Sequence, residues 1–234
     1  MAINISTLRT RALTALIFVA AMLAGLLWNR WSFIALFTVI HFGCWYEFVK
    51  LLKKIDPRKY LRYSLAGLFY ITLPILVMLC LRLCKIFVTG PQDYIFTIIP
   101  PLLIPCAIIC AIWINDTMAY LVGSVIGKTP FSKISPKKTW EGTAGGAILC
   151  VITIALLGYY LPAARDIAVR HWIAIAAICA VTGTAGDLLE SKIKRLADVK
   201  DSGSIMPGHG GFLDRFDSLL IATPFVGLYV YLFV

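Results

Sequence analysis

Long apolar runs dominate the chain and alternate with short polar connections. Each run is close to the roughly 20 predominantly apolar residues that a helix needs to cross a membrane. Seven such runs lie near residues 13–28, 32–52, 64–84, 104–126, 142–162, 171–190 and 216–233. The period-two alternation of a β-barrel is absent, and a backbone in lipid must satisfy its own hydrogen bonds. The pattern therefore predicts an all-α polytopic membrane protein, a bundle of about seven transmembrane helices. Residues 85–103, interrupted by Pro100 and Pro101, leave an eighth or ninth span open.

Basic residues predict how this bundle is oriented, because short loops rich in Lys and Arg stay on the cytoplasmic side. Most Lys and Arg residues fall in alternate connections, around residues 9–11, 53–62, 128–138 and 192–215. We therefore expect a cytoplasmic N-terminus, an odd number of spans and active-site loops that face the cytoplasm from the cell inner (plasma) membrane. We expect N-terminal helices over 1–100 and a catalytic region over 101–234, integrated in a single membrane domain.

Composition agrees with this class and narrows the partners. The chain is 60% hydrophobic and 15% charged, with a mean hydropathy of +0.85, which excludes an ordinary soluble domain. The net charge of +10 comes with no extended basic face or aromatic platform, so we expect no nucleic acid. Anionic headgroups of the membrane lipid bilayer are the better partner for this charge.

Two polar motifs stand near the middle of the chain. Asn115 and Asp116 lie within an apolar run, where an aspartate must be paired, hydrated or bound to a cation. A polar contact between helices is the alternative for this pair. Lys137 and Lys138 precede a predicted helix, and ammonium groups at a helix N-terminus can bind phosphate. These two lysines could instead only hold their loop in the cytoplasm.

Gly142 and Gly146, which follow the lysines, have GxxxG spacing. Small residues at this spacing let two membrane helices approach closely. We therefore predict that these glycines pack helices rather than bind phosphate.

The segment from residue 187 to 217 gathers charge and glycine between two apolar runs. Asp187, Glu190, Ser191 and Lys194 recur at helical spacing and share one face. Glycines around His209 allow backbone N–H groups to converge on an anion. A capping role in the turn is the alternative for His209.

Asp214 and Asp217 begin the last predicted span and project to the same side of its helix. Two like carboxylates repel each other in a low dielectric, so a cation is expected between them. Oxygen ligands without a His/Cys set favour Mg²⁺ over zinc. Arg215 can bind a phosphate oxygen through its planar guanidinium.

These features describe a site that handles phosphates and a lipid. Lys and Arg residues would bind phosphates, and the apolar bundle implies that one substrate is a lipid. No Ser/His/Asp or Cys/His nucleophile is apparent, so we expect a mechanism without an enzyme nucleophile. Transfer onto a lipid phosphate is such a mechanism, since the monoester oxygen itself attacks.

The window from Ser191 to Asp217 resembles the signature of the phosphatidate cytidylyltransferases, also called CDP-diacylglycerol synthases. The matching residues are Ser191, Lys194, Arg195, Lys200, Asp201, Pro207, His209, Gly210, Gly211, Asp214, Arg215 and Asp217. The upstream NDTMAY and ISPKKTWEG motifs also resemble those of the family and occur in the same order. The resemblance covers roughly residues 104–234.

The resemblance implies a multi-span helical homodimer that converts CTP and phosphatidate into CDP-diacylglycerol and pyrophosphate. It implies Mg²⁺, often together with K⁺, and assigns Asp187, Asp214 and Asp217 to the metals. It implies catalytic roles for Asp187, Asp214, Asp217, Lys194, Arg195 and His209. The substrate-binding residues implied are Asn115, Asp116, Lys137, Lys138, Ser191, Lys200, Asp201, Gly210, Gly211 and Arg215.

Two other readings of the sequence stay open. A related CTP-dependent enzyme would act on an isoprenoid lipid, as a CDP-archaeol synthase or a lipid kinase does. An ion-coupled transporter could also hold Asp116 and Asp187 inside a bundle. A transporter gives no reason for the cluster of Lys, Arg and Gly beside Asp214.

Overall fold

Helices make up most of the described chain, as predicted from its apolar runs. The computed structural model describes residues 5–84, 86–89, 96–205 and 210–234. The long helices are α1 (Ile5–Leu27), α2 (Arg30–Ile55), α5 (Leu103–Ile126), α6 (Trp140–Tyr160), α7 (Val169–Leu196) and α8 (Leu213–Phe233). Between α2 and α5, the helix α3 (Tyr60–Ser64), the π-helical turn Leu68–Thr72 and α4 (Leu73–Leu83) follow one another. A short 3-10 turn, Pro162–Ala164, precedes α7.

The class of fold agrees with the prediction, although fewer of the described helices than the seven expected are long enough to span a membrane. Within the described residues, six helical segments are long and apolar enough to cross a membrane: α2, Tyr60–Leu83, α5, α6, α7 and α8. The apolar part of α1, Thr14–Leu27, is a shorter seventh segment. The all-α polytopic membrane fold is therefore confirmed, and the protein is an integral membrane protein.

The uncertain segment between residues 85 and 103 contains short strands where the structure describes it. Strands β1 (Ile86–Thr89) and β2 (Phe96–Ile99) pair antiparallel, with Ile86 opposite Ile99. Each strand has four residues, whereas a helix across the bilayer needs roughly 20. This segment therefore adds no further span within its described residues.

A side-chain cap separates the first two helices. Asn29 Oδ1 accepts hydrogen bonds from the backbone N–H groups of Trp31 (2.8 Å) and Ser32 (2.9 Å). Ser32 Oγ accepts in return from the Asn29 N–H at 3.1 Å. This reciprocal capping box satisfies N–H groups that have no partner inside α2, so the chain turns sharply between α1 and α2.

Glycines bring α5 and α6 into close contact, as their spacing predicted. A Cβ on Gly142 would lie 2.7 Å from the carbonyl oxygen of Ala119, and one on Gly146 would lie 2.7 Å from the Ala119 backbone nitrogen. Any larger side chain at either position would push the helices apart. The packing role of these two glycines is confirmed.

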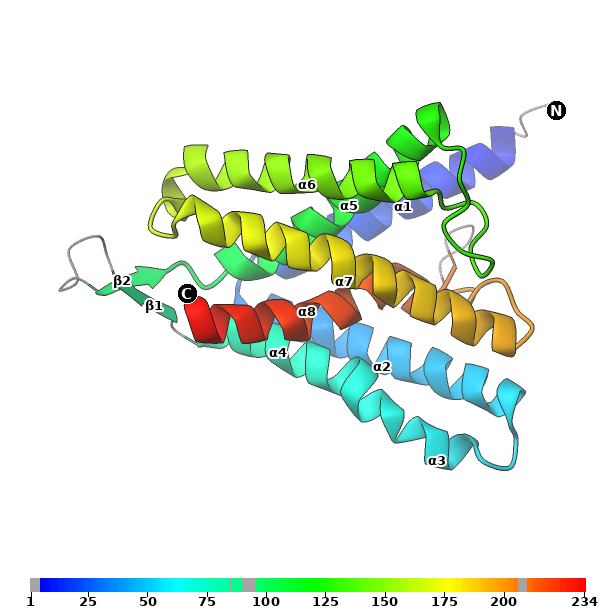
Figure 1. Ribbon diagram of the computed structural model, residues 1–234. Coiled ribbons are helices and arrows are strands. Elements are labelled where there is room, and N and C mark those ends of the chain that lie inside the picture. The colour runs from blue at the N-terminus through cyan, green and yellow to red at the C-terminus, as the bar shows by residue number, and fades with distance from the viewer. Residues whose placement is uncertain (1–4, 85, 90–95, 206–209) are drawn as a thin grey trace.

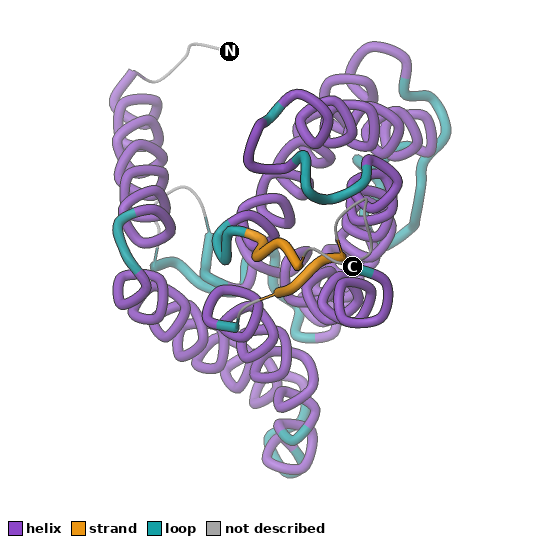
Figure 2. Tube along the Cα trace, turned by 90° about the vertical axis from the view of Figure 1, so that its left-hand side faces the viewer, coloured by secondary structure: helices purple, strands orange, loops and turns teal. Residues whose placement is uncertain are grey.

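The helices pack around α8. Helices α5, α6 and α7 lie on one side of it, with α2 and α4 on the other (Figure 1). Helix α1 stands apart from this group and leans on α2 (Figure 2). The polar connections after α2, α5 and α7 lie at one end of the bundle, whereas the strands and the C-terminus lie at the other (Figure 1).

Candidate active site

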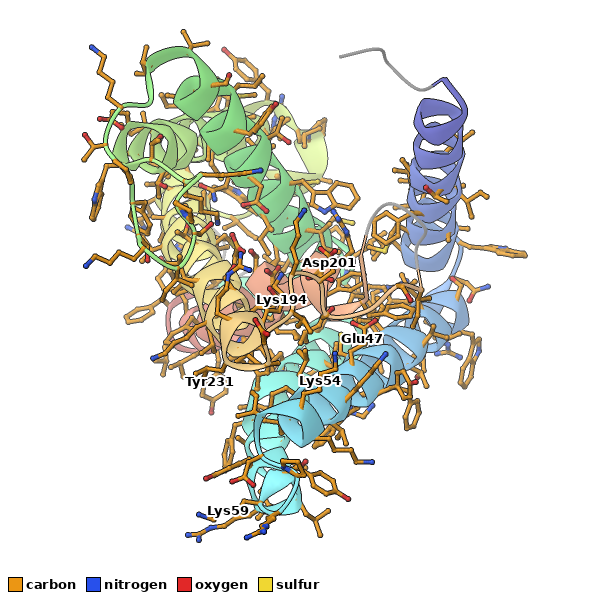
Figure 3. The ribbon with its side chains drawn as sticks, turned by 90° about the vertical axis from the view of Figure 1, so that its right-hand side faces the viewer. Glu47, Lys54, Lys59, Lys194, Asp201 and Tyr231 are labelled. Carbon is orange, nitrogen blue, oxygen red and sulfur yellow. The ribbon has the colours of Figure 1, made fainter. Side chains whose placement is uncertain are left out.

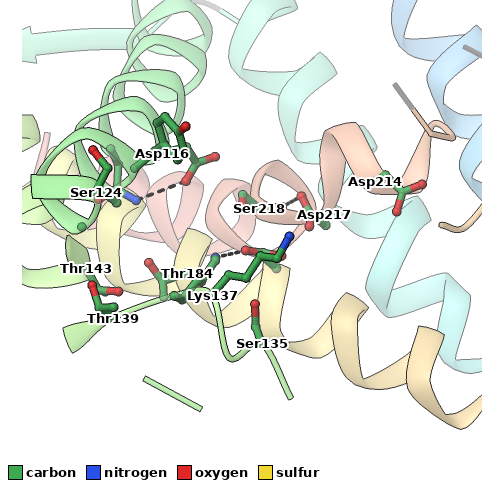
Figure 4. A pocket seen from close by; sticks show the side chains of 16 residues that line it. Asp116, Ser124, Ser135, Lys137, Thr139, Thr143, Thr184, Asp214, Asp217 and Ser218 are labelled. Carbon is green, nitrogen blue, oxygen red and sulfur yellow. Dashed lines mark hydrogen bonds and ion pairs between the residues drawn. The ribbon is translucent and has the colours of Figure 1, made fainter. Parts of the chain in front are cut away.

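A polar cavity opens where α5, α7 and α8 meet the connection between α5 and α6. Its volume is about 470 Å³. Figure 4 shows Asp116 from α5, Lys137 from the connection and Asp217 from α8 around the same space. The lining residues are Asn115, Asp116, Ala119, Tyr120, Gly123, Ser124, Ser135, Lys137, Lys138, Thr139, Thr143, Thr184, Asp187, Asp214, Asp217 and Ser218.

Three carboxylates converge beside this cavity. One oxygen each from Asp187, Glu190 and Asp217 lies within 4.8 Å of the others. Asp187 and Asp217 line the cavity, whereas Glu190 is fully buried with 0% of its surface exposed. Asp187 and Glu190 come from one face of α7, and Asp217 comes from the first turns of α8.

A close crossing of α7 and α8 produces this convergence. Gly186 stands directly before Asp187, and a Cβ there would lie 2.6 Å from the backbone oxygen of Asp217. At Gly183, one turn earlier, a Cβ would meet Ser218 at an ordinary contact distance of 3.5 Å. The missing side chain at Gly186 therefore lets the backbone of α8 come near enough for Asp217 to join the two acids of α7.

Two lysines offset part of this negative charge. Lys138 forms an ion pair with Asp187. Lys194 Nζ lies 2.5 Å from Glu190 Oε2 and 2.6 Å from Asp214 Oδ1, so one ammonium group serves two carboxylates. Burial lowers the pKa of Lys138, and the nearby carboxylates of Asp116 and Asp217 act in the opposite direction.

Asp214 faces the cavity but is held mainly by the protein itself. Its Oδ2 accepts hydrogen bonds from the N–H groups of Ser202 and Gly211, each at 2.8 Å, and from Ser202 Oγ at 2.8 Å. Its other oxygen accepts from Lys194. Asp214 thus organises the turn before α8, and it lies outside the group of three converging carboxylates. All three predicted metal ligands nevertheless line the one cavity.

The connection that carries the two cavity lysines is fixed at its base by Glu141. This carboxylate accepts hydrogen bonds from the N–H groups of Lys128 (3.2 Å) and Thr129 (3.1 Å) and from Thr129 Oγ1 (2.7 Å). Thr139 Oγ1 also caps α6 by accepting from the Gly142 N–H at 3.1 Å. These bonds hold residues 127–139 folded over the cavity, with Lys137 and Lys138 directed toward it.

The α5 pair and Ser191 also lie at the site. Asn115 Nδ2 donates to Asp116 Oδ1 at 3.4 Å. Asn115 is buried, and among the described residues its Oδ1 has no hydrogen-bond partner. Ser191 Oγ lies 3.5 Å from Asp187 Oδ1 and donates toward it.

The other predicted site residues that the structure describes do not line the cavity. Arg195, Lys200, Asp201 and Arg215 are exposed, and they are not among the described residues that form the cavity wall. His209 lies outside the described residues. Gly210 has a φ of +81°, a backbone conformation that favours glycine. The N–H of Gly211 donates to Asp214.

The acidic group has the chemistry of a divalent-cation site. All its ligand atoms are carboxylate oxygens, which suit hard ions such as Mg²⁺. Glu190 carries the clearest sign, because it is fully buried and its Oε1 has no hydrogen-bond partner among the described residues. Its ion pair with Lys194 is the interaction that offsets its charge. Asp187, Glu190 and Asp217 therefore fit such an ion.

Two acidic residues, one in the acidic group and one beside the start of α8, were absent from the predicted metal ligands and substrate contacts. Glu190 shares a helical face with Asp187, so its spacing could have identified it as a ligand. Glu47 is a carboxylate inside the apolar run of α2, and it lies against the turn before α8. An acidic residue inside a membrane span is by itself a signal of function, and that signal could have found Glu47.

Comparison with known proteins gives consistent matches. Residues 75–233 match a protein family described as "Cytidylyltransferase family". "Phosphatidate cytidylyltransferase" of Rickettsia typhi is 30% identical over 228 residues, which cover 95% of this chain and 92% of that protein. "Phosphatidate cytidylyltransferase" of Bacillus subtilis is 45% identical over 123 residues. "Phosphatidate cytidylyltransferase 4, chloroplastic" of Arabidopsis thaliana is 45% identical over 120 residues.

The extent of these matches differs between relatives. The matched part covers 52% of this chain and 45% of the Bacillus protein. The match to the Arabidopsis protein covers 51% of this chain and 29% of that protein. The chain therefore spans less than half of the length of these two relatives, whereas its match to the Rickettsia protein extends over nearly all of both chains.

Proposed function

Since this chain belongs to the cytidylyltransferase family and resembles phosphatidate cytidylyltransferases, we propose that it transfers CMP from CTP to phosphatidate. The products are CDP-diacylglycerol and pyrophosphate. The observation that carries this proposal is one cavity at the end of an apolar bundle. It is lined both by acidic residues and by the ammonium groups of Lys137 and Lys138. Such a cavity suits a nucleoside triphosphate and a lipid phosphate that meet at the membrane surface.

The bond changes in this reaction balance without an enzyme nucleophile. An oxygen of the phosphatidate monoester attacks the α-phosphorus of CTP and forms the new P–O bond. The bond from the α-phosphorus to the oxygen bridging the β-phosphorus breaks, and its electrons leave with pyrophosphate. The protein's task is then alignment and stabilisation of charge.

The basic residues would bind and orient the phosphates. Lys137 and Lys138 lie on the folded connection above the acidic group, where their ammonium groups would attract the triphosphate. The exposed Arg195, Lys200 and Arg215 surround the same end of the bundle and would steer anionic substrates toward it. Lys194, held between Glu190 and Asp214, would keep these two carboxylates fixed while substrates exchange.

The acidic residues would hold a divalent cation. Asp187, Glu190 and Asp217 would bind Mg²⁺, with Asp214 beside them and K⁺ as a further candidate. An Mg²⁺ ion bound there would neutralise the charge that builds up on the leaving pyrophosphate. Asn115, with its buried unpaired carbonyl oxygen, and Asp116 would contribute polar contacts to the substrates.

The setting of the site follows from the same proposal. The connections rich in Lys and Arg, which share one end of the bundle, would face the cytoplasm, where CTP is dissolved. The protein would lie in the inner (plasma) membrane and draw phosphatidate from the bilayer. A homodimer is the assembly that the family resemblance implies.

Positional labelling of CTP tests the proposed reaction. Purified protein is incubated with Mg²⁺, phosphatidate and CTP labelled with ³²P at either the α- or the γ-phosphate. We expect the α-label in a lipid product and the γ-label in pyrophosphate, with both products absent after chelation of Mg²⁺. γ-label in the lipid would identify a CTP-dependent lipid kinase and contradict the proposal.

Substrate replacement separates the remaining alternative. An isoprenoid or archaeal lipid phosphate takes the place of phosphatidate in the same assay. Faster transfer of the α-label to that lipid than to phosphatidate would assign the chain to isoprenoid-lipid chemistry. Transfer to neither lipid, from protein that remains folded, would refute a cytidylyltransferase activity.

A further inference from the structure

A buried carboxylate from α2 lies directly against the start of α8. Glu47 has 1% of its surface exposed, and Figure 3 shows it facing the segment that leads into α8. The family match begins at residue 75, so Glu47 lies outside the matched region. An ionised side chain so deeply buried is costly unless it is hydrogen-bonded, and the partners of Glu47 therefore indicate its role.

Glu47 replaces the missing cap of α8. Phe212, at the N-cap position, forms no side-chain cap bond. Instead, Glu47 Oε1 accepts from the Phe212 N–H at 3.0 Å and Oε2 accepts from the Leu213 N–H at 2.9 Å. Helix N-termini have N–H groups without intrahelical partners and a partial positive charge. A carboxylate from another helix thus supplies both the acceptor and the compensating negative charge.

Ser202 connects this cap to the cavity. Its hydroxyl lies 2.8 Å from Glu47 Oε2 and 2.8 Å from Asp214 Oδ2. Its N–H donates to the same Asp214 oxygen at 2.8 Å. Glu47, Ser202 and Asp214 therefore form a continuous polar chain from α2 to the wall of the cavity.

Two glycines, Gly203 and Gly211, leave room for the side chain of Glu47. At Gly203 and at Gly211, the three atoms nearest to a hypothetical Cβ all belong to the side chain of Glu47. A Cβ at either position would overlap the Glu47 carboxylate oxygens. The backbone at residues 203 and 211 can therefore lie against Glu47 because these two residues lack side chains.

We propose that Glu47 is a positioning residue: by capping α8 from α2, it sets the position of Asp214 and Asp217 in the cavity. Its consequence for catalysis rests on the proposed function, whereas its structural effect does not. Glu47 touches no cavity space itself, since it is absent from the described residues that line the cavity. It acts through the backbone of Phe212 and Leu213 and through Ser202.

The first test uses a double-mutant cycle. Gly203→Ala should impair turnover because the new methyl group collides with Glu47, and Glu47→Ala should lower kcat about 10- to 100-fold, as loss of a supporting partner typically does. In the Glu47→Ala background, where the collision is gone, Gly203→Ala should add less than about a twofold further loss. Residues that share a contact are expected to show such non-additivity.

A second glycine serves as the matched control for the cycle. A Cβ on Gly227 would overlap Val77 rather than Glu47. The effect of Gly227→Ala should therefore multiply with that of Glu47→Ala, as for independent sites. Equal losses from Gly203→Ala in both backgrounds would overturn the proposed fit between Glu47 and this segment.

The second test measures the cap without using activity, with Glu47→Gln as the variant that keeps the side-chain size. The amide introduced by this substitution retains one carbonyl acceptor but places N–H donors opposite a backbone donor. Hydrogen exchange of the peptide over residues 211–218 should become at least about tenfold faster. Cys44→Ala, a buried change one turn earlier on α2, should leave that exchange unchanged.

The two readouts separate failure of this proposal from failure of the proposed reaction. Faster exchange in Glu47→Gln, in a protein whose parent makes no CDP-diacylglycerol, would leave the cap established and refute the reaction. An active parent with a Glu47→Gln variant that matches it in exchange, kcat and Mg²⁺ dependence would refute the positioning role. A rise in the Mg²⁺ concentration for half-maximal rate, with folding intact, would support that role through Asp217.

Discussion

At the scale of single residues, the site depends on carboxylates that are brought together and only partly neutralised. Asp217 is buried, and its Oδ1 accepts from the Ser218 N–H at 2.7 Å. We expect Asp217→Asn to lower the rate of CDP-diacylglycerol formation by at least about 100-fold, because the amide lacks the negative charge that a divalent cation requires. Thermal unfolding should change little, since Asn keeps the size of Asp and one acceptor oxygen.

The control for this prediction is a carboxylate far from the cavity. Asp166 is exposed in the connection between α6 and α7, at the opposite end of the bundle (Figure 1). Asp166→Asn should retain the parent rate in the same labelled-CTP assay. Parent activity in Asp217→Asn would remove this residue from the proposed cation site.

A different prediction concerns Lys194, because its ammonium group is paired with two carboxylates, Glu190 and Asp214. Lys194→Ala would leave Glu190 and Asp214 without their ammonium partner, and breaking a buried ion pair in this way costs about 3–5 kcal/mol. We expect a large fall in the melting temperature together with loss of activity. Lys192→Ala, an exposed change two residues earlier, should alter neither. A Lys194→Ala protein as stable as the parent would show that the pair contributes nothing to folding.

At the scale of helices, the crossing of α7 and α8 determines whether the acidic group forms. Gly186→Ala would place a methyl group 2.6 Å from the backbone oxygen of Asp217, and backbone cannot move aside as a side chain can. Overpacking of this kind costs about 1–3 kcal/mol. We expect reduced thermal stability and a higher Mg²⁺ requirement. Gly183→Ala, with its nearest contact at 3.5 Å, should be tolerated in the same assays.

The helices themselves were largely predictable, and their ends were less so. Hydropathy marks each span because a helix that crosses lipid is predominantly apolar over roughly 20 residues. Helix α7, however, continues to Leu196, whereas its apolar run ends near residue 190. Beyond that point the helix leaves the apolar core, and its last turns carry Lys194 and Arg195, basic residues that favour a helix C-terminus.

The site was predictable only where its residues share a local pattern. Helical spacing identified one face of α7 with Asp187, and the last span was expected to begin with Asp217. The partners of Glu47 could not be predicted by such reasoning, because it meets Leu213 across 166 residues of sequence. The separate role of Asp214 likewise depends on Ser202 and Lys194, which reach it from other segments.

At the scale of the whole molecule, the shared position of the polar connections predicts a sidedness that labelling can measure. Lys59 and Asp166 are exposed, one between α2 and α3 and the other between α6 and α7. These two connections lie at opposite ends of the bundle (Figure 1), so we consider Lys59→Cys and Asp166→Cys. An impermeant maleimide should label Lys59→Cys only in inverted vesicles and Asp166→Cys only in right-side-out vesicles, above the baseline of the parent's seven cysteines. The reverse pattern would contradict the proposed cytoplasmic site.

The hydroxyl between Glu47 and Asp214 carries a single hydrogen, so Ser202 can satisfy only one of these acids at a time. The first and last parts of the chain thus compete for the same donor. A cation that draws electron density from Asp214 would make this carboxylate a weaker hydrogen-bond acceptor. The Ser202 hydroxyl would then donate to Glu47. Loading of the cavity would then strengthen the hydrogen bond from Ser202 to Glu47, and with it the contact between α2 and the start of α8.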